Sequence, residues 1–454
     1  MTDGGSAAAG GGERTSLLHK IMWTAGAFGA SFLLKIASTV LLARLLAPEI
    51  FGVMVVVQSI RIGMELLTDV GIEQNIVNHR HGLTPRFFNT AWTMQIVRGL
   101  LLSLLFAALS PWLSAVYRLD PTIFLVVSCA PLLNSLASTS IFVLVKTLEV
   151  RRRNLFELQA EVINFLLCVG LALLMPTVWA LIWGMLLSIA ARSALSYRLP
   201  HPAHRLLLDR QHVREILGFG KWIMASSLLN YASTYIDRLF IGRMAPMQAL
   251  GLYGIARNIS DLPGSLAGRL GYRVFFPLIA RLKANRDEAA LREFARVRLL
   301  IVAVAAGGIG AVASGADIAI DILYDDRYRA AGPILFLLLL SAWFTVLAQL
   351  NEVALLGLGK ASAISYANGV RIALLCLFMP PGFHHYGLAG ATAALVASEA
   401  GRFLHMSVAS LRQRALGIAF GRQDTGGTLL FLIVVGALTA ARHRLGLGVP
   451  WAGL

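Results

Sequence analysis

Apolar runs long enough to cross a lipid bilayer follow one another along the chain, from Ile21 to Leu432. A spanning helix needs about 20 consecutive apolar residues. The composition agrees, because 57% of residues are hydrophobic and 14% are charged, whereas soluble proteins have roughly 45–50% and about 25%. The longest polar stretch after the N-terminus, Arg192 to Arg214, is shorter than the roughly 50 residues of a small independent domain. The sequence therefore predicts an all-α polytopic membrane protein and excludes a single soluble catalytic core.

Twelve segments are expected to span the membrane, and a thirteenth or fourteenth is left open. Proline and glycine punctuate them, as at Ala47-Pro48 and Pro380-Pro381-Gly382. They lie near residues 20 to 46, 50 to 76, 87 to 109, 122 to 147, 156 to 175, 177 to 197, 216 to 242, 248 to 278, 294 to 315, 331 to 357, 361 to 380 and 386 to 411, with a weaker segment at 427 to 446.

These segments predict two six-helix lobes around a central cavity. Residues 1 to 19 are expected to form a disordered cytoplasmic tail. The predicted parts after it are an N-lobe at 20 to 197, a basic cytoplasmic linker at 198 to 215, a C-lobe at 216 to 411, and a C-terminal tail at 412 to 454 that holds the extra segment.

The distribution of positive charge predicts the orientation. The chain has 40 Lys and Arg against 24 Asp and Glu, a net charge of +16. Alternate connections carry most of the cations, including Arg151 to Arg153 and the linker, and basic loops favour the cytoplasm. The N-terminus is therefore predicted to be cytoplasmic. This topology accounts for the charge without a nucleic-acid partner, although a thirteenth span would place Arg442 and Arg444 outside.

No metal, cofactor or disulfide framework is expected. Cys129, Cys168 and Cys376 lie in separate apolar runs without paired spacing. The linker histidines, His201, His204 and His212, lack a supporting carboxylate or cysteine cluster. A nucleotide-binding loop is also absent, because the segment from Ala354 to Ala361 lacks the first glycine and the hydroxyl of that motif.

An internal repeat relates the two halves. Ala47-Pro48 followed by Phe51-Gly52 matches Ala245-Pro246 followed by Leu250-Gly251. Both copies follow an odd-numbered segment, which predicts two lobes related by an axis along the membrane normal.

Each copy is followed by a ladder of ionisable residues at a spacing of four, which predicts a polar stripe on one helix face. The first ladder is Arg61, Glu65, Asp69 and Glu73, and the second is Arg257, Asp261, Ser265, Arg269 and Arg273. Charges at mid-bilayer are costly, so the stripes are expected to face protein or water. Two interpretations remain open, namely buried ion pairs that lock helices together and a hydrated cavity between the lobes.

The segments around the repeat resemble those of a known transporter family. They include Leu41 to Gly52 with Asp69-Val-Gly71, and Tyr235 to Gly242 with Leu262-Pro263. These residues are similar to the opening helices of Wzx-type oligosaccharide flippases, which are polysaccharide biosynthesis exporters of the multidrug/oligosaccharidyl-lipid/polysaccharide (MOP) superfamily.

The resemblance implies transport of an undecaprenyl-diphosphate-linked oligosaccharide across the bacterial inner membrane by alternating access, with no catalytic residue. Membrane lipids, and a glycan polymerase with its export machinery, are the implied partners. A cationic cavity suits a diphosphate because arginine donates bidentate hydrogen bonds to phosphate. The expected substrate-binding cations are Lys35, Arg61, Arg98, Arg257, Arg269, Arg273 and Arg371. The expected carboxylates for proton or sodium coupling are Glu65, Asp69, Asp237, Asp261 and Glu352.

Two rival functions stay open. A drug or metabolite antiporter of the same superfamily would share the fold and use one or two of the carboxylates. A membrane glycan polymerase or ligase would usually hold its acceptor in a large outer loop, and no such loop is evident. The excess of arginine on the second ladder favours an anionic cargo.

Overall fold

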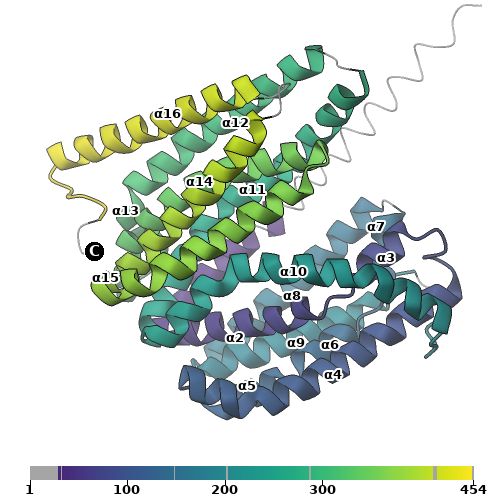
Figure 1. The fold of residues 1–454 in the computed structure, drawn as a ribbon. Coiled ribbons are helices and arrows are strands. Elements are labelled where there is room, and N and C mark those ends of the chain that lie inside the picture. The colour runs from purple at the N-terminus through teal and green to yellow at the C-terminus, as the bar shows by residue number, and fades with distance from the viewer. Residues whose placement is uncertain are drawn as a thin grey trace, which may run out of the picture. The chain divides into compact units, whose positions relative to one another are not determined.

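The computed structural model describes residues 29–31, 33–147, 149–200, 203–285, 288–412 and 417–451, and this part of the chain is helical with no strand. The predicted tail at residues 1 to 19 lies outside the described residues. The chain divides into two compact units, Met1–Leu46 with Ile60–Ser227 and Ala47–Ser59 with Leu228–Leu454 (Figure 1). Two helices, α2 and α10, begin in one unit and end in the other.

The first unit contains the end of α2 (Pro48–Leu67), the start of α10 (Arg210–Met244) and the helices between them. These are α3 (Ile72–Asn78), α4 (Pro85–Tyr117), α5 (Pro121–Val127), α6 (Ala130–Ser135), α7 (Ser140–Lys146), α8 (Val150–Leu174) and α9 (Val178–Ser196). The second unit contains the remainder of α2 and α10 with α11 (Met247–Asn285), α12 (Glu288–Ser314), α13 (Ala316–Leu323), the 3-10 helix η1 (Asp326–Tyr328), α14 (Ala331–Gly357), α15 (Ala361–Leu411) and α16 (Gly417–Arg444).

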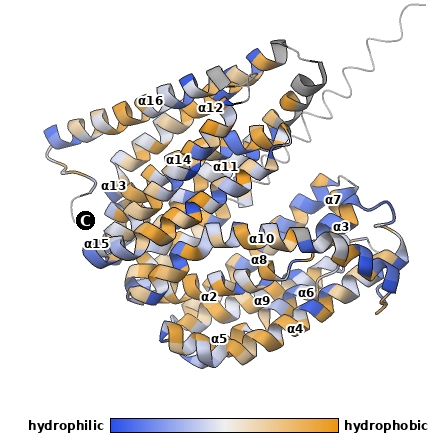
Figure 2. Cartoon of the chain, in the orientation of Figure 1, coloured by the Kyte–Doolittle hydropathy of each residue, from blue (hydrophilic) through white to orange (hydrophobic). Residues whose placement is uncertain are grey.

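Within the described residues, eight helices are long and apolar enough to cross a membrane, or nine if the bent pair α5–α6 and α7 forms one span. Figure 2 shows the apolar residues along these helices. The predicted polytopic all-α architecture is confirmed, whereas the count of twelve stays a prediction. Helix α11, which carries the second ladder, and helix α10 are also long. They are less apolar than the eight candidate spans and are not counted among them.

Helix α15 is a hairpin of two helices. Its backbone leaves the helical region at Tyr386 and Gly387, where Gly387 has a φ of +56°. Beyond this break the chain returns along itself, because a Cβ on Gly390 would lie 1.9 Å from the carbonyl oxygen of Gly382. Further along the two arms, Arg371 pairs with Glu399. The two predicted segments 361 to 380 and 386 to 411 correspond to these arms.

The predicted second segment, residues 50 to 76, is not one helix. Helix α2 ends at Leu67, and α3 begins at Ile72 after a turn. The carboxylate of Asp69 accepts the backbone N–H of Gly71 at 2.9 Å, and Gly71 adopts a φ of +65° that glycine tolerates readily. The prediction of a continuous ladder from Arg61 to Glu73 was therefore wrong, because the Asp69 turn interrupts the helix.

The fourth predicted segment is broken as well, with a bend of 50° between α5–α6 and α7. Side chains from neighbouring helices bind the backbone groups that the break leaves free. Gln95 Nε2 donates to the carbonyl oxygens of Ser135 at 2.8 Å and Ala137 at 3.0 Å. The N–H of Ser138 donates to Ser196 Oγ at 2.7 Å. The break is thus a hydrogen-bonded feature of the first unit.

The extra C-terminal segment forms α16, which packs on α12 and α15 in the second unit. Near one end, the buried Arg298 guanidinium of α12 pairs with Asp424 at 2.5 Å. Near the other end, Arg442 donates to both carboxylate oxygens of Asp317, at 2.7 and 2.6 Å. Arg442, one of the two cations that a thirteenth span would place outside, is therefore paired with a carboxylate of the same unit.

Candidate functional site

The second unit holds a buried network of charged side chains contributed by α10, α11, α14 and α15. Asp237 accepts a hydrogen bond from the Tyr253 hydroxyl, and its Oδ2 lies 3.9 Å from Arg257 Nε. Arg257 Nε lies 3.1 Å from Asp261 Oδ1, and Arg238 Nη2 lies 2.9 Å from the other oxygen of Asp261. Arg257 therefore binds carboxylates of two helices.

The arms of α15 continue this network. Arg371 pairs with Glu399 at 2.8 Å and donates to Ser233 Oγ at 2.8 Å. Arg402 pairs with Glu352 of α14 at 2.7 Å. Together the network contains four arginines and four carboxylates, namely Arg238, Arg257, Arg371, Arg402, Asp237, Asp261, Glu352 and Glu399. Its formal charge is zero, so Arg257 and Arg371 have protein counter-ions.

The network also leaves buried polar atoms without a hydrogen-bond partner, including Asp237 Oδ1 and Arg371 Nε. Burying a polar atom without a partner costs free energy, and such atoms usually mark a bound water or an alternative arrangement. The network is thus neutral in charge but incompletely hydrogen-bonded.

The polar stripe of α11 passes from buried to exposed along the helix. Arg257 is buried, Asp261 has a side chain that is 44% exposed, and Arg269 and Arg273 are both exposed. Helix α11 is continuous over Met247–Asn285, but a spacing of four turns each successive residue about 40° around the axis, so the ladder winds from the buried side of the helix at Arg257 to the exposed side at Arg273. The accessible cations of this stripe are therefore Arg269 and Arg273.

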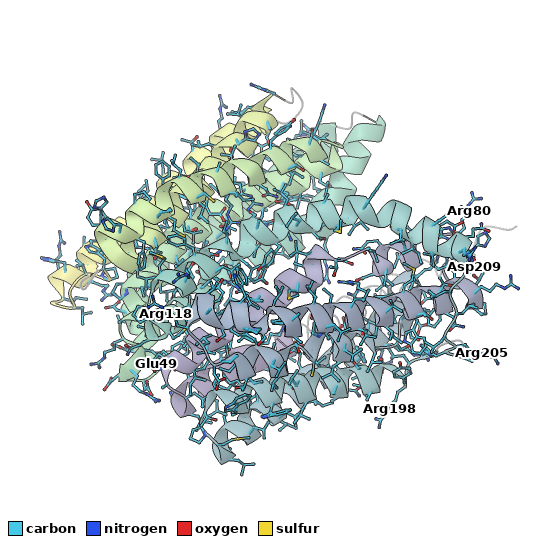
Figure 3. All side chains as sticks on the ribbon, turned by 60° about the horizontal axis from the view of Figure 1, so that its bottom comes forward. Glu49, Arg80, Arg118, Arg198, Arg205 and Asp209 are labelled. Atoms are coloured by element: carbon cyan, nitrogen blue, oxygen red, sulfur yellow. The ribbon has the colours of Figure 1, made fainter. Side chains whose placement is uncertain are left out.

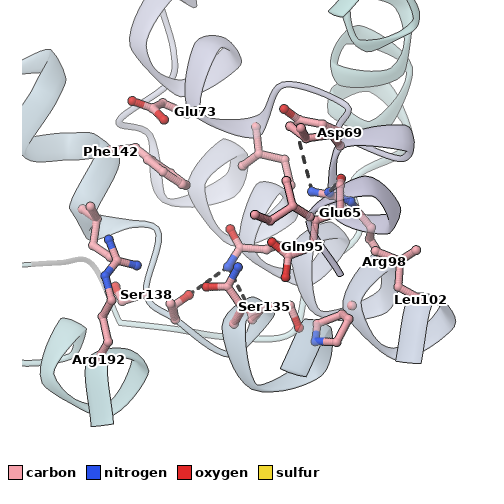
Figure 4. A pocket seen from close by; sticks show the side chains of 18 of the residues that line it. Glu65, Asp69, Glu73, Gln95, Arg98, Leu102, Ser135, Ser138, Phe142 and Arg192 are labelled. Atoms are coloured by element: carbon pink, nitrogen blue, oxygen red, sulfur yellow. Dashed lines mark hydrogen bonds and ion pairs between the residues drawn. The ribbon is translucent and has the colours of Figure 1, made fainter. Parts of the chain in front are cut away.

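The first unit contains a polar cavity of about 350 Å³ between α2, α3, α4, α6, α7 and α9. Figure 4 shows the acidic side chains Glu65, Asp69 and Glu73 around it, with Arg98 and Arg192 at opposite sides. Arg192 pairs with Glu157 at 3.0 Å. The cavity wall thus carries three carboxylates and two arginines.

Arg98 binds the end of α2. Its Nε donates to Thr68 Oγ1 at 3.0 Å, it also donates to the backbone carbonyl of Glu65, and its Nη1 lies 3.9 Å from Asp69 Oδ1. Arg61 pairs with Glu65 at 2.8 Å. Both predicted anion-binding cations therefore lie next to carboxylates, and Arg98 also binds the backbone carbonyl of Glu65 in the last turn of α2.

The structure distributes the predicted site residues over separate places. Asp237, Arg257, Asp261, Glu352 and Arg371 join the network of the second unit, and Glu65, Asp69 and Arg98 line the cavity of the first. Lys35 has a side chain that is 65% exposed and pairs with Glu161 of α8 at 2.9 Å.

Sequence reasoning missed two cavity residues. Gln95 stands three positions before Arg98, so both side chains lie on one face of α4. That spacing could have indicated Gln95. Arg192 was not among the expected site residues, and no local pattern links it to its partner Glu157, 35 positions away.

The structure thus defines an all-helical polytopic membrane protein with polar sites inside its helical units. A model of the family described as "Polysaccharide biosynthesis protein" matches residues 41–333, which is more than half of the chain. The chain belongs to this family, and the resemblance to polysaccharide exporters is confirmed.

Three relatives are similar to this chain. The teichuronic acid biosynthesis protein TuaB of Bacillus subtilis (strain 168) is 25% identical over 309 residues, 66% of this chain and 63% of that protein. The succinoglycan biosynthesis transport protein ExoT of Rhizobium meliloti (strain 1021) is 21% identical over 359 residues, 78% of this chain and 72% of that protein. The lipopolysaccharide biosynthesis protein WzxC of Escherichia coli (strain K12) is 23% identical over 286 residues, 61% and 56% respectively. The match thus spans less than two thirds of the TuaB and WzxC lengths.

Two solved structures show the same fold. The lipid II flippase MurJ in an inward closed conformation aligns with a TM-score of 0.69 and 11% identity, over 93% of this chain and 99% of that chain. An inward-facing multidrug resistance MATE family transporter of the MOP superfamily aligns with a TM-score of 0.63 and 14% identity, over 88% and 95%. At this identity the likeness shows the fold alone.

Proposed function

We propose that this protein is a flippase that moves an undecaprenyl-diphosphate-linked oligosaccharide, or a related polysaccharide precursor, across the bacterial inner membrane by alternating access. The family match, and the similarity to the biosynthesis proteins TuaB and WzxC and to the succinoglycan transport protein ExoT, support this function. The observation that carries it for this chain is the cationic stripe of α11, which becomes exposed at Arg269 and Arg273. No catalytic step is included in the proposal.

The substrate headgroup is proposed to contact Arg269 and Arg273, the exposed cations of α11. Guanidinium groups donate two parallel hydrogen bonds to a phosphate, which suits a diphosphate. Arg257 and Arg371 of the network, and Arg61 and Arg98 of the first unit, already bind carboxylates. Their proposed role is to position the helices and to exchange partners when the headgroup binds.

Ion coupling is proposed for the carboxylates that water can reach. Asp261 is 44% exposed at its side chain, Glu352 is 27% exposed, and Glu65 and Asp69 line the cavity of the first unit. Asp237 is buried and bound by Tyr253, so it would respond through Arg257. A proton or sodium ion that neutralises one of these carboxylates would release its arginine.

The positive-charge distribution places the N-terminus and the basic linker in the cytoplasm in this proposal. A glycan polymerase with its export machinery would take up the product on the other side of the membrane. Accessibility of a cysteine introduced at Arg80 to an impermeant maleimide, in cells and in inverted vesicles, tests the orientation.

A drug or metabolite antiporter is the second candidate. The observation in its favour is the cavity wall with three carboxylates, Glu65, Asp69 and Glu73, because such a wall suits a cationic solute. Export of glycan and drug susceptibility, measured together in a deletion strain, separate the two functions.

The test of the proposed headgroup contact is the double variant Arg269→Ala with Arg273→Ala. We expect a strong loss of glycan export at unchanged protein levels, whereas the control Arg118→Ala retains export. Full export by the double variant would contradict the anion contact.

A further inference from the structure

The connection between α9 and α10 contains an extended strap, residues 203–209, fastened along the start of α4. Four hydrogen bonds join the strap to side chains in the first turns of α4. They involve the backbone of every second strap residue, at positions 203, 205, 207 and 209. Asn89 donates to the carbonyl of Ala203 at 3.2 Å and accepts the N–H of Arg205 at 3.1 Å. Thr93 Oγ1 accepts the N–H of Leu207 at 3.0 Å, and Thr90 Oγ1 accepts that of Asp209 at 3.3 Å. The strap therefore has a defined position on the first unit.

Three successive leucines of the strap are exposed. Leu206 is 73% exposed, Leu207 39% and Leu208 56%. A run of exposed leucines on a hydrogen-bonded backbone is unfavourable in water and marks an interaction surface. The strap thus presents a preformed apolar edge.

The strap covers the start of a face of α4 that is exposed and apolar further along the helix. Positions 89, 93, 97 and 101 follow one another at a spacing of four, so Asn89 and Thr93 lie in line with Val97 and Leu101. Beyond the strap this face carries large exposed apolar side chains: Val97, Leu100, Leu101, Leu104 and Leu105. The backbone N–H of Leu207 binds Thr93, and Val97, the first residue of this apolar belt, lies one helical turn, about 5.4 Å along the axis, beyond Thr93.

Exposed arginines surround the leucines. Arg198, Arg205, Arg210 and Arg214 all have exposed side chains, and none makes an ion pair with a residue that the structure describes. Asp209 accepts the backbone N–H groups of Gln211 and His212 at the start of α10. These hydrogen bonds lower the pKa of the Asp209 carboxyl, with the one to His212 contributing most. Figure 3 shows Arg198, Arg205 and Asp209 at one end of the first unit and Arg118 at the other.

We propose that the strap, residues 203–209, together with Arg198, Arg210 and Arg214, forms an interfacial anchor that binds anionic phospholipid. The leucines of the strap enter the boundary between headgroups and acyl chains, and the arginines bind the lipid phosphates. The charge of the surroundings and the continuity with the lipid-facing side of α4 favour a lipid surface over a protein partner. This anchor fixes the start of α10 at the membrane surface.

The depth of the strap can be measured in nanodiscs with the full chain. Single cysteines replace Leu206 or Leu208 in a Cys129→Ser, Cys376→Ser background and carry a bimane fluorophore. A label at Leu101→Cys on the apolar face of α4 is the membrane control, and a label at Arg80→Cys is the water control. We expect brominated lipid to quench both strap labels at least half as strongly as the label at position 101, and we expect aqueous iodide to quench the label at position 80. Labels at 206 and 208 that behave like the one at position 80, or that neither quencher reaches, would overturn the anchor in favour of water or a protein cover.

The second arm tests the choice of lipid. Brominated phosphatidylglycerol is titrated into phosphatidylcholine nanodiscs that contain the Leu206→Cys label. The measured quantity is the fraction of brominated phosphatidylglycerol that gives half-maximal quenching. Each arginine near the membrane surface contributes about fivefold in affinity for anionic lipid, so the double variant Arg205→Gln with Arg210→Gln is expected to raise this fraction at least fivefold. The control Arg118→Gln, at the other end of the unit, is expected to leave it unchanged. Equal midpoints for the double variant and the unsubstituted protein would contradict anionic-lipid binding.

Discussion

Gly52 of α2 and Gly251 of α11 pack backbone against backbone, and each faces the carbonyl group four positions before the other. A Cβ on Gly52 would lie 1.9 Å from the carbonyl oxygen of Met247, and one on Gly251 would lie 1.8 Å from that of Pro48. The two glycines are the equivalent positions of the internal repeat, so the repeat brings its own copies into contact.

Alanine at either glycine is therefore expected to destabilise the second unit. The added methyl group meets backbone atoms that cannot rotate away, and overpacking of this kind costs about 1–3 kcal/mol or more. Thermal unfolding in detergent measures the loss. Gly170→Ala in α8 is the matched control, because its Cβ would contact nothing within 4 Å. Equal melting temperatures for Gly52→Ala and Gly170→Ala would refute the close crossing.

The Arg371 and Glu399 pair predicts strong non-additivity. Removing the guanidinium in Arg371→Met breaks the shorter of the two ion pairs of the buried Glu399 and leaves Arg402, 3.6 Å away, as its counter-ion, so the expected cost is at most the roughly 3–5 kcal/mol of breaking a buried pair. The double variant Arg371→Met with Glu399→Gln removes both charges and is expected to recover much of this loss. A double-mutant cycle on melting temperature measures the coupling, and additive effects would show that the two charges act independently.

The Asp317 and Arg442 pair predicts a dependence on acidic pH. The hydrogen bonds from Arg442 are the largest cause of the lowered pKa of the Asp317 carboxyl. A carboxyl whose pKa is lowered by folding stabilises the folded state at every pH above its unfolded pKa of about 3.9. This stabilisation is lost as the pH falls through the pKa of the folded state. The melting temperature of the unsubstituted protein should therefore fall more between pH 7 and about pH 3 than that of Asp317→Asn. Parallel curves would contradict the pair.

Gln95 is expected to be required for the break between α6 and α7. Leucine at this position leaves the carbonyls of Ser135 and Ala137 without a donor, at about 1–3 kcal/mol for each buried group. We expect Gln95→Leu to lower the melting temperature and to increase proteolysis near residue 137, whereas Gln95→Glu tests whether the donor itself is needed. Unchanged stability in both variants would mean that water replaces the side chain.

The fold was largely predictable because apolar length is a local property. The segment at 331 to 357 coincides with α14. The two arms of α15 correspond to the predicted segments 361 to 380 and 386 to 411, but the first arm continues through Pro380-Pro381 and the break lies at Tyr386 and Gly387. The break at Asp69 was not predictable from hydropathy, since it depends on one hydrogen bond between a carboxylate and the N–H of Gly71.

The candidate site was predictable only in part. The spacing of four places Arg257 beside Asp261 on α11, and the structure shows this pair. The partners from other helices are set by packing, as for Arg371 and Glu399, so the sequence alone suggested an excess of cations where the network is neutral. Charge balance inside a helical bundle requires the three-dimensional neighbours.

The most direct test of the proposed flippase is the leaflet in which the lipid-linked oligosaccharide accumulates when the protein is depleted from cells. The glycan is probed in spheroplasts and in inverted vesicles with an impermeant sugar-oxidising reagent. We predict that depletion traps it in the cytoplasmic leaflet and that restored expression returns it to the outer leaflet. An unchanged distribution between the two leaflets after depletion would contradict the proposed function.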